Sequence, residues 1–107
     1  MSAEQLTDAL QRLVRHVGHW QADRWAAPAV EPAGRRRGDV LHDLVQQIAD
    51  LAADGERQPR RPVPRLDTDL ALTDQLRVVT ADLLGTDPPD EVLATVNQKI
   101  RAVHHGL

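Results

Sequence analysis

The sequence predicts an all-α protein, built as a small bundle of four helices within a single domain over residues 1–107. Two observations support this class. Apolar residues recur at three- and four-residue spacings along four segments, and no segment shows the alternation of a half-buried strand. A chain of 107 residues, 41% hydrophobic, suits one small core. We expect helices at about 2–25, 40–54, 69–84 and 88–105, packed antiparallel.

The first predicted helix covers residues 2–25. Its apolar stripe consists of Leu6, Leu10, Leu13, Val14 and Val17. Ser2 is a good N-cap, and Pro28 requires the helix to stop before it. Gly18 offers an alternative end at which the helix stops or kinks. Continuation through Gly18 is the favoured interpretation, because it places Trp20 beside the apolar stripe.

The second predicted helix covers residues 40–54 and follows a loop at 28–38 that is rich in proline and arginine. Its stripe is the most regular in the chain: Val40, Leu41, Leu44, Val45, Ile48, Leu51 and Ala52. Asp39 precedes this stripe as an N-cap, and Gly55 follows it as a C-terminal cap residue.

A second loop rich in proline and arginine is predicted at residues 55–66. Pro59, Pro62 and Pro64 fall within six positions, which excludes a helix and favours an extended, polyproline-like strip over the surface. We interpret this strip as a stiff connector between helices. The alternative interpretation is a ligand for an aromatic-lined groove, although the spacing of its prolines and arginines departs from the usual pattern.

The third and fourth predicted helices, 69–84 and 88–105, are separated by a short turn that starts at Gly85. Their apolar stripes are Leu72, Leu76, Val79 and Leu83, and Val92, Val96, Ile100 and Val103. Asp87 is the expected N-cap of the fourth helix, with Pro88 at its first helical position. The short turn predicts that these two helices form a tight hairpin.

Composition excludes several functional classes. The chain has no cysteine, which removes disulfides, thiolate metal sites and cysteine catalysis. With 13 basic and 16 acidic residues its net charge is −3, which argues against a protein that coats nucleic acid over its whole surface. The start of the chain has no signal-peptide pattern, and no apolar run is long enough to span a membrane. We therefore expect a cytoplasmic, bacterial protein without membrane contact.

No catalytic or metal-binding constellation is found. His16 and His19 have a spacing that can bind a metal on a helix, but the helical wheel places them at the boundary and in solvent. His104 and His105 are explained by the C-terminal end of their helix, which favours positive charge. Nucleophile-elbow, phosphate-loop and zinc-protease motifs are all missing. We assign no catalytic residue, metal ligand or cofactor, and expect a protein that is not an enzyme.

The leading functional hypothesis is a non-catalytic helical protein that acts by association, with itself or with a protein partner. Trp20 and Trp25 are the only aromatic residues, and a continuous helix would separate them by about 140°. They therefore cannot both face one narrow core. Tryptophan is a frequent interface anchor, so these two residues are the candidate interface; packing under a loop is the alternative for Trp25.

The alternative hypothesis is a regulator that binds an anion or nucleic acid through its two loops. Residues 35–65 carry seven basic and five acidic side chains, whereas residues 66–107 carry three basic and seven acidic ones. Arginine binds phosphate through its forked guanidinium, but no aromatic residue lies among these arginines for base stacking. The candidate contacts are Arg35, Arg36, Arg37, Arg60, Arg61 and Arg65.

Overall fold

The computed structural model describes all 107 residues and confirms that the protein is all-α, with five α-helices and one short 3-10 turn. The elements are α1 (Ala3–Val17), α2 (Ala22–Ala26), α3 (Arg37–Gly55), the 3-10 turn η1 (Asp69–Ala71), α4 (Leu72–Gly85) and α5 (Asp90–Gly106). The predicted number of helices was therefore one too low, because the five-residue α2 is a helix of its own. No helix is both long and apolar enough to cross a membrane.

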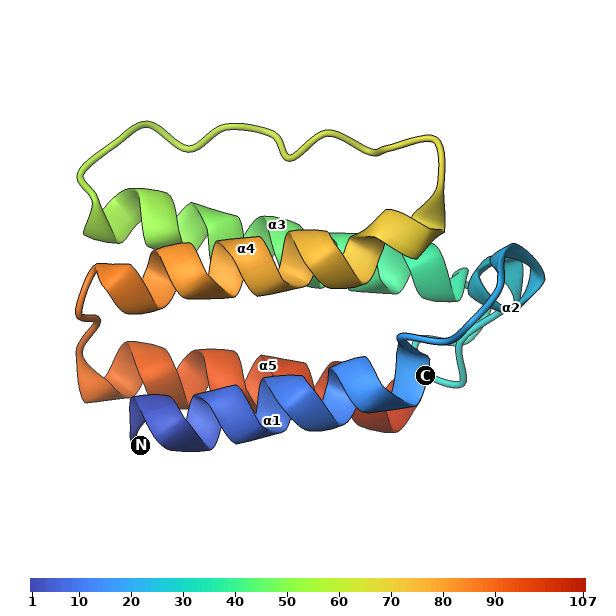
Figure 1. Cartoon of the computed structure of the whole chain (residues 1–107), viewed down its shortest axis with the longest axis horizontal. Helices are drawn as coiled ribbons and strands as arrows, with labels where there is room; N and C mark the ends of the chain where they lie inside the picture. Colours follow the sequence, from blue (N-terminus) through green and yellow to red (C-terminus); the bar gives the residue numbers. More distant parts are fainter.

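The four long helices form two layers, α3 beside α4 and α1 beside α5 (Figure 1). Helices within a layer run in the same direction: Gly38 of α3 lies against Asp69 just before α4, and Gly55 at the end of α3 lies against Thr86 just after α4. Likewise, His16 near the end of α1 contacts His104 near the end of α5. This parallel packing within each layer differs from the antiparallel arrangement that we expected.

The predicted hairpin between the third and fourth helices is wrong for a related reason. The turn after Gly85 is short, but it carries the chain from one layer to the other (Figure 1). The most extensive helix contacts of α4 are with α3, and those of α5 are with α1. A short connection makes two helices antiparallel, yet it does not make them closest neighbours.

An extended segment, residues 58–68, returns the chain along the length of α3 and makes the parallel pairing of α3 and α4 possible (Figure 1). We call this segment the strap. Gln46 of α3 holds its backbone with both ends of its amide: Oε1 accepts a hydrogen bond from the Val63 N–H at 2.6 Å, and Nε2 donates to the Arg61 carbonyl at 3.0 Å. His42 Nε2 lies 3.1 Å from the Val63 carbonyl oxygen. Val63 itself is half-buried against the core.

The loop before α3 closes over the end of α5. The backbone N–H groups of Val30 and Glu31 donate to the carbonyl oxygen of Gly106, at 2.8 and 3.1 Å. A side chain at position 106 would place its Cβ 2.4 Å from the Glu31 carbonyl oxygen, so this contact requires glycine. The N–H of Arg37 donates to Ala27, which joins the two ends of the loop.

The first helix ends at Val17, so the predicted continuation to residue 25 is wrong. The Gly18 N–H donates to the Val14 carbonyl at 2.7 Å, and a Cβ at position 18 would lie only 2.6 Å from that oxygen. After Gly18 the chain leaves the helix and turns into α2. Because the helix is interrupted after Val17, the two tryptophans are not held at the fixed angle of about 140° that a continuous helix would give them. Both side chains can therefore point inward, and only 3% of Trp20 and 1% of Trp25 is exposed.

The core is mostly aliphatic, as the stripes predicted, and also contains both tryptophans. Its largest fully buried side chains are Leu6, Leu13, Val17, Leu41, Leu44, Val45, Ile48, Leu72, Leu76, Leu83, Ile100 and Trp25. Burial of each such side chain stabilises the fold by about 1.5–3 kcal/mol. The second predicted helix corresponds to α3, which starts at Arg37, three residues before the predicted position 40. Gly38 lies so close to Asp69 that a Cβ at this position would collide with the Asp69 carboxylate.

We expect Gln46→Ala to destabilise the protein by about 1–3 kcal/mol, because it leaves backbone groups of the strap without their partners. Urea unfolding followed by circular dichroism measures this change. Gln47→Ala is the matched control, because Gln47 is exposed and makes no such bonds. Equal stability of the two variants would show that Gln46 does not hold the strap.

Candidate functional site

The two tryptophans of the predicted interface lie together inside the molecule. Their ring centroids are 5.0 Å apart in an edge-to-face arrangement, and His16 approaches Trp20 with a centroid distance of 5.4 Å. Such aromatic pairs add to the stabilisation that comes from burial. Because both indoles are almost fully buried, they pack the core and leave no exposed tryptophan on the surface of this chain.

Two arginines lie over the ring system of Trp20. The guanidinium carbons of Arg37 and Arg24 lie 4.9 and 5.4 Å from the centre of the Trp20 ring system, within the range of cation–π interactions. Arg37 also donates to the Arg24 carbonyl at 3.3 Å. One of the six loop arginines predicted to bind anions is therefore held in a packing role.

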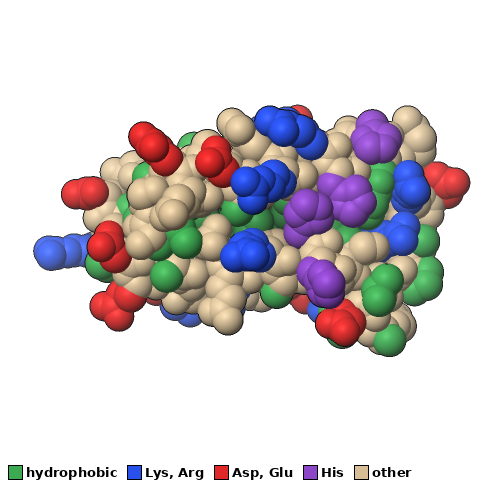
Figure 2. Space-filling view, turned by 90° about the horizontal axis from the view of Figure 1, so that it is seen from below, with side chains coloured by type: hydrophobic (Ala, Val, Ile, Leu, Met, Phe, Trp, Pro, Cys, Tyr) green, Lys and Arg blue, Asp and Glu red, His purple; other side chains and the backbone are tan.

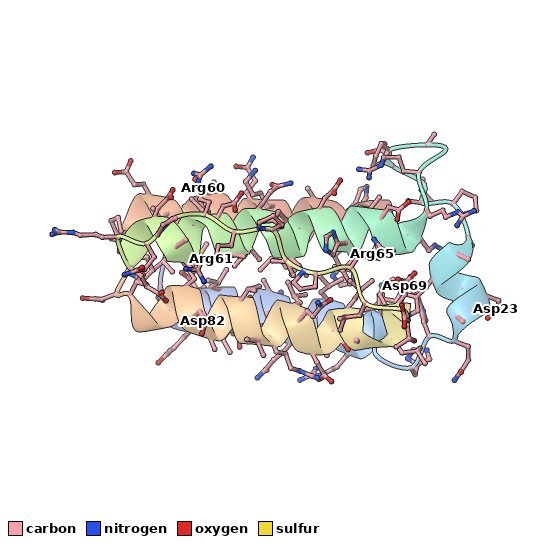
Figure 3. All side chains as sticks on the ribbon, turned by 90° about the horizontal axis from the view of Figure 1, so that it is seen from above. Asp23, Arg60, Arg61, Arg65, Asp69 and Asp82 are labelled. Atoms are coloured by element: carbon pink, nitrogen blue, oxygen red, sulfur yellow. The ribbon has the colours of Figure 1, made fainter.

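Three further loop arginines are held by carboxylates. Arg35 pairs with Asp43, and Arg60 donates two hydrogen bonds to Asp54 at 3.0 and 2.7 Å. Arg65 lies between Asp39 and Asp69 at 3.1 and 2.9 Å, and Figure 3 labels Arg65 and Asp69 of this group. The hydrogen bond from Arg60 lowers the pKa of Asp54, and the bonds to their carboxylates raise the pKa of Arg35 and Arg60. Arg36 and Arg61 have no ion-pair partner.

The structure does not gather these six arginines into one patch. Arg65 contacts the first turn of α3 and Arg60 contacts its last turn (Figure 3). Asp39 and Asp54, their respective partners, are about 22 Å apart along the helix at a rise of 1.5 Å per residue. The loop arginines therefore serve mainly to attach the strap and the loop at 28–36 to α3.

A different basic cluster lies between α1 and α5. Its groove has a volume of about 450 Å³ and is lined by Ala9, Arg12, His16, Arg101, His104 and His105. No carboxylate lines it. Figure 2 shows the basic and histidine side chains gathered over the middle and right of the face formed by α1 and α5. We call this feature the basic groove.

The groove exists because α1 and α5 run in the same direction. Each helix carries basic residues in its last turn, Arg15 and His16 in α1 and His104 and His105 in α5, where the helix dipole favours positive charge. Parallel packing brings these turns together, so the His16 and His104 rings lie 5.0 Å apart between centroids. The last-turn basic residues are visible in the sequence, but the pairing of the two helix ends is not.

Burial lowers the pKa of His104, and the neighbouring His16 lowers it further. The neutral imidazole is thus favoured in the folded protein. An anion placed in the groove would oppose both effects, because it would stabilise the charged form of His104. The chemistry available here is recognition of an anionic group by two guanidinium forks and three imidazoles.

The structure brings together no group of three or more histidine, cysteine or acidic side chains that could hold a metal ion. Comparisons with protein-family models, curated proteins and solved structures found no match. The function is therefore inferred from the geometry of this chain. The basic groove joins two arginines that form no ion pair with three histidines in one concave surface.

We expect the stability of the protein to fall as the pH decreases through the titration range of His104. Its pKa in the folded state lies below the unfolded value of 6.5, so the unfolded chain takes up this proton more readily. The loss of stability begins near pH 7 and is complete below the pKa of His104 in the folded state. His104→Gln should reduce this pH dependence, measured as thermal midpoints between pH 7.5 and 5. His19→Gln, at an exposed position, is the control; identical slopes in both variants would contradict the assignment.

Proposed function

We propose that this chain is a non-catalytic helical protein that acts by association, and that it binds an anionic group of its partner in the basic groove. The observation that carries this proposal is the meeting of Arg12, Arg101 and three histidines in a groove without any carboxylate. In this proposal the four long helices act as a rigid four-helix scaffold, and the protein works in the cytoplasm. The lack of cysteine is compatible with a reducing compartment.

The charge balance of the groove favours an anion. The C-terminal ends of two helices together contribute about −1 charge. Arg12 and Arg101 alone contribute +2, and neither takes part in an ion pair. Both side chains are exposed and free to reach a ligand. The loop arginines are less available, since most of them already contact carboxylates or Trp20.

A protein carboxylate or a phosphate group suits this groove better than a nucleic-acid strand. Single-stranded nucleic acids bind through stacking of bases on exposed aromatic side chains, and both tryptophans are buried. The net charge of −3 also disfavours sequence-independent binding to a polyphosphate backbone. Binding of an acidic segment of a protein unites the association hypothesis with the anion-binding one.

The proposal predicts that Arg12→Ala/Arg101→Ala weakens binding of a poly-glutamate peptide by about tenfold or more. Each lost charge-assisted hydrogen bond contributes about 1.5–3 kcal/mol, and 1.4 kcal/mol corresponds to a tenfold change. Isothermal titration calorimetry at low ionic strength measures the affinity. Arg57→Ala/Arg61→Ala is the matched control, since it removes the same charge from two exposed arginines outside the groove. Equal losses in both double variants, or no binding by the unmodified protein, would refute the proposal.

The same titration has an expected pH dependence. Protonation of His104 adds positive charge to the groove, so the peptide should bind more tightly at pH 5.5 than at pH 7.5. Part of this gain should be lost in His104→Gln, because that side chain can no longer take up a proton on binding. An affinity that is unchanged over this pH range would show that His104 does not contact the bound anion.

A further inference from the structure

We propose that the partner is a second copy of this chain, docked face to face through α1 and α5. This inference rests on the proposed function, because it fills the basic groove with carboxylates of the second copy. It adds the identity of the partner and the symmetry of the complex. The evidence is the distribution of charge along the face that contains the groove.

The face formed by α1 and α5 is divided into an acidic half and a basic half. The acidic half contains Glu4, Asp8, Asp90 and Glu91, all exposed near the start of the two helices. The basic half contains Arg12, Arg15, His16, Arg101, His104 and His105, toward their ends. Figure 2 shows most acidic side chains of this view at its left and the histidines with most basic side chains at its middle and right; one basic side chain protrudes at the left end, and two acidic ones lie at the right edge and beside the lowest histidine.

Helical geometry keeps both halves on one surface. Glu4, Asp8 and Arg12 follow one another at four-residue spacing, so they form a row along the exposed side of α1. Because α1 and α5 are parallel, Glu91 lies at the same end of the face as Glu4, and Arg101 lies beside Arg12 in the groove. The division of charge is thus a property of the whole layer.

The charges of this face have no partners within the chain. Every ion pair in the structure joins residues of α3, η1, α4 or the loops beside α3, including Arg65 with Asp69 and Arg77 with Asp74. Neither the acidic nor the basic half takes part in one. Complementary charges that are unpaired within one chain can pair between two chains, which sets orientation and partner choice.

A two-fold axis that lies in the interface, perpendicular to the helices, makes this pairing complete. It turns the second copy end for end, so each acidic half faces the basic half of the other copy, and the same contacts form twice. It also makes the helices of the two copies antiparallel. A two-fold axis parallel to the helices would instead place like charges opposite each other, which is unfavourable.

The size of the face fits a weak dimer. The molecule measures 37 × 26 × 22 Å, and α5, with 17 residues, runs for about 25 Å along the longest dimension, while α2 extends beyond its end (Figure 1). The face formed by α1 and α5 is therefore about 550 Å² per partner, which is the range of weak interfaces and below that of a standard-size one. Because the contacts are charged and exposed, the dimer should form at low ionic strength and dissociate as salt screens the charges.

Sedimentation velocity with two charge-reversal variants tests the inference. Arg12→Glu/Arg101→Glu makes the face predominantly acidic, with Arg15 remaining, and Glu4→Lys/Glu91→Lys gives it a net positive charge, with Asp8 and Asp90 remaining. We expect the unmodified protein to dimerise at low salt and each variant alone to be monomeric. An equimolar mixture of the two variants should form a heterodimer, because an acidic face then meets a basic one. Circular dichroism of each variant verifies that the helices are retained.

The outcomes separate this inference from the proposed function. A monomeric unmodified protein at low salt and high concentration would overturn the dimer, even if the groove still binds poly-glutamate. Self-association that persists in both variants, or a mixture that stays monomeric while the unmodified protein dimerises, would also overturn this interface. Loss of peptide binding together with a monomeric state would overturn both proposals. Association restored only in the mixture supports the proposed two-fold symmetry.

Discussion

The attachment of the strap to α3 is the interaction on which the rest of the structure depends. Gln46 hydrogen-bonds the backbone at Arg61 and Val63, so the chain returns along α3 before α4 begins. α4 therefore starts at the same end of the molecule as α3, and α5 runs back in the other layer, parallel to α1. The basic ends of α1 and α5 meet as a consequence. The strap that Gln46 holds on α3 thus belongs to the path of the chain that brings the basic ends of α1 and α5 together.

Under the proposed function, binding of an anion in the basic groove would be coupled to the stability of the fold. Packing His104 against His16 brings together groups that would repel each other if both were charged, and burial adds to this cost. The fold tolerates the arrangement while His104 is neutral. A bound carboxylate or phosphate group would offset the repulsion and promote uptake of the proton. A cluster of like charges is typical of a binding surface, because it lowers the stability of the free protein and strengthens binding of a ligand of opposite charge.

The loop arginines show how sequence and structure differ in what they reveal about function. Their clustering predicted an anion-binding surface, but Arg35, Arg60 and Arg65 pair with carboxylates of α3 or η1. Which carboxylate an arginine meets depends on how the loops fold back, and no spacing in the sequence records this. The groove residues gave only a weak signal, because basic residues in a last turn are expected from the helix dipole alone.

The sequence by itself determined the all-α class, the apolar faces of the helices and the absence of cysteine chemistry, because these follow from local periodicity and composition. The tertiary structure decided the break at Gly18, the burial of both tryptophans, the direction of α4 and α5, and the meeting of Arg12 with Arg101. Helix formation depends on neighbours three and four residues away. Pairing of helix ends instead depends on contacts between distant segments, such as Gln46 with the strap, which periodicity does not encode.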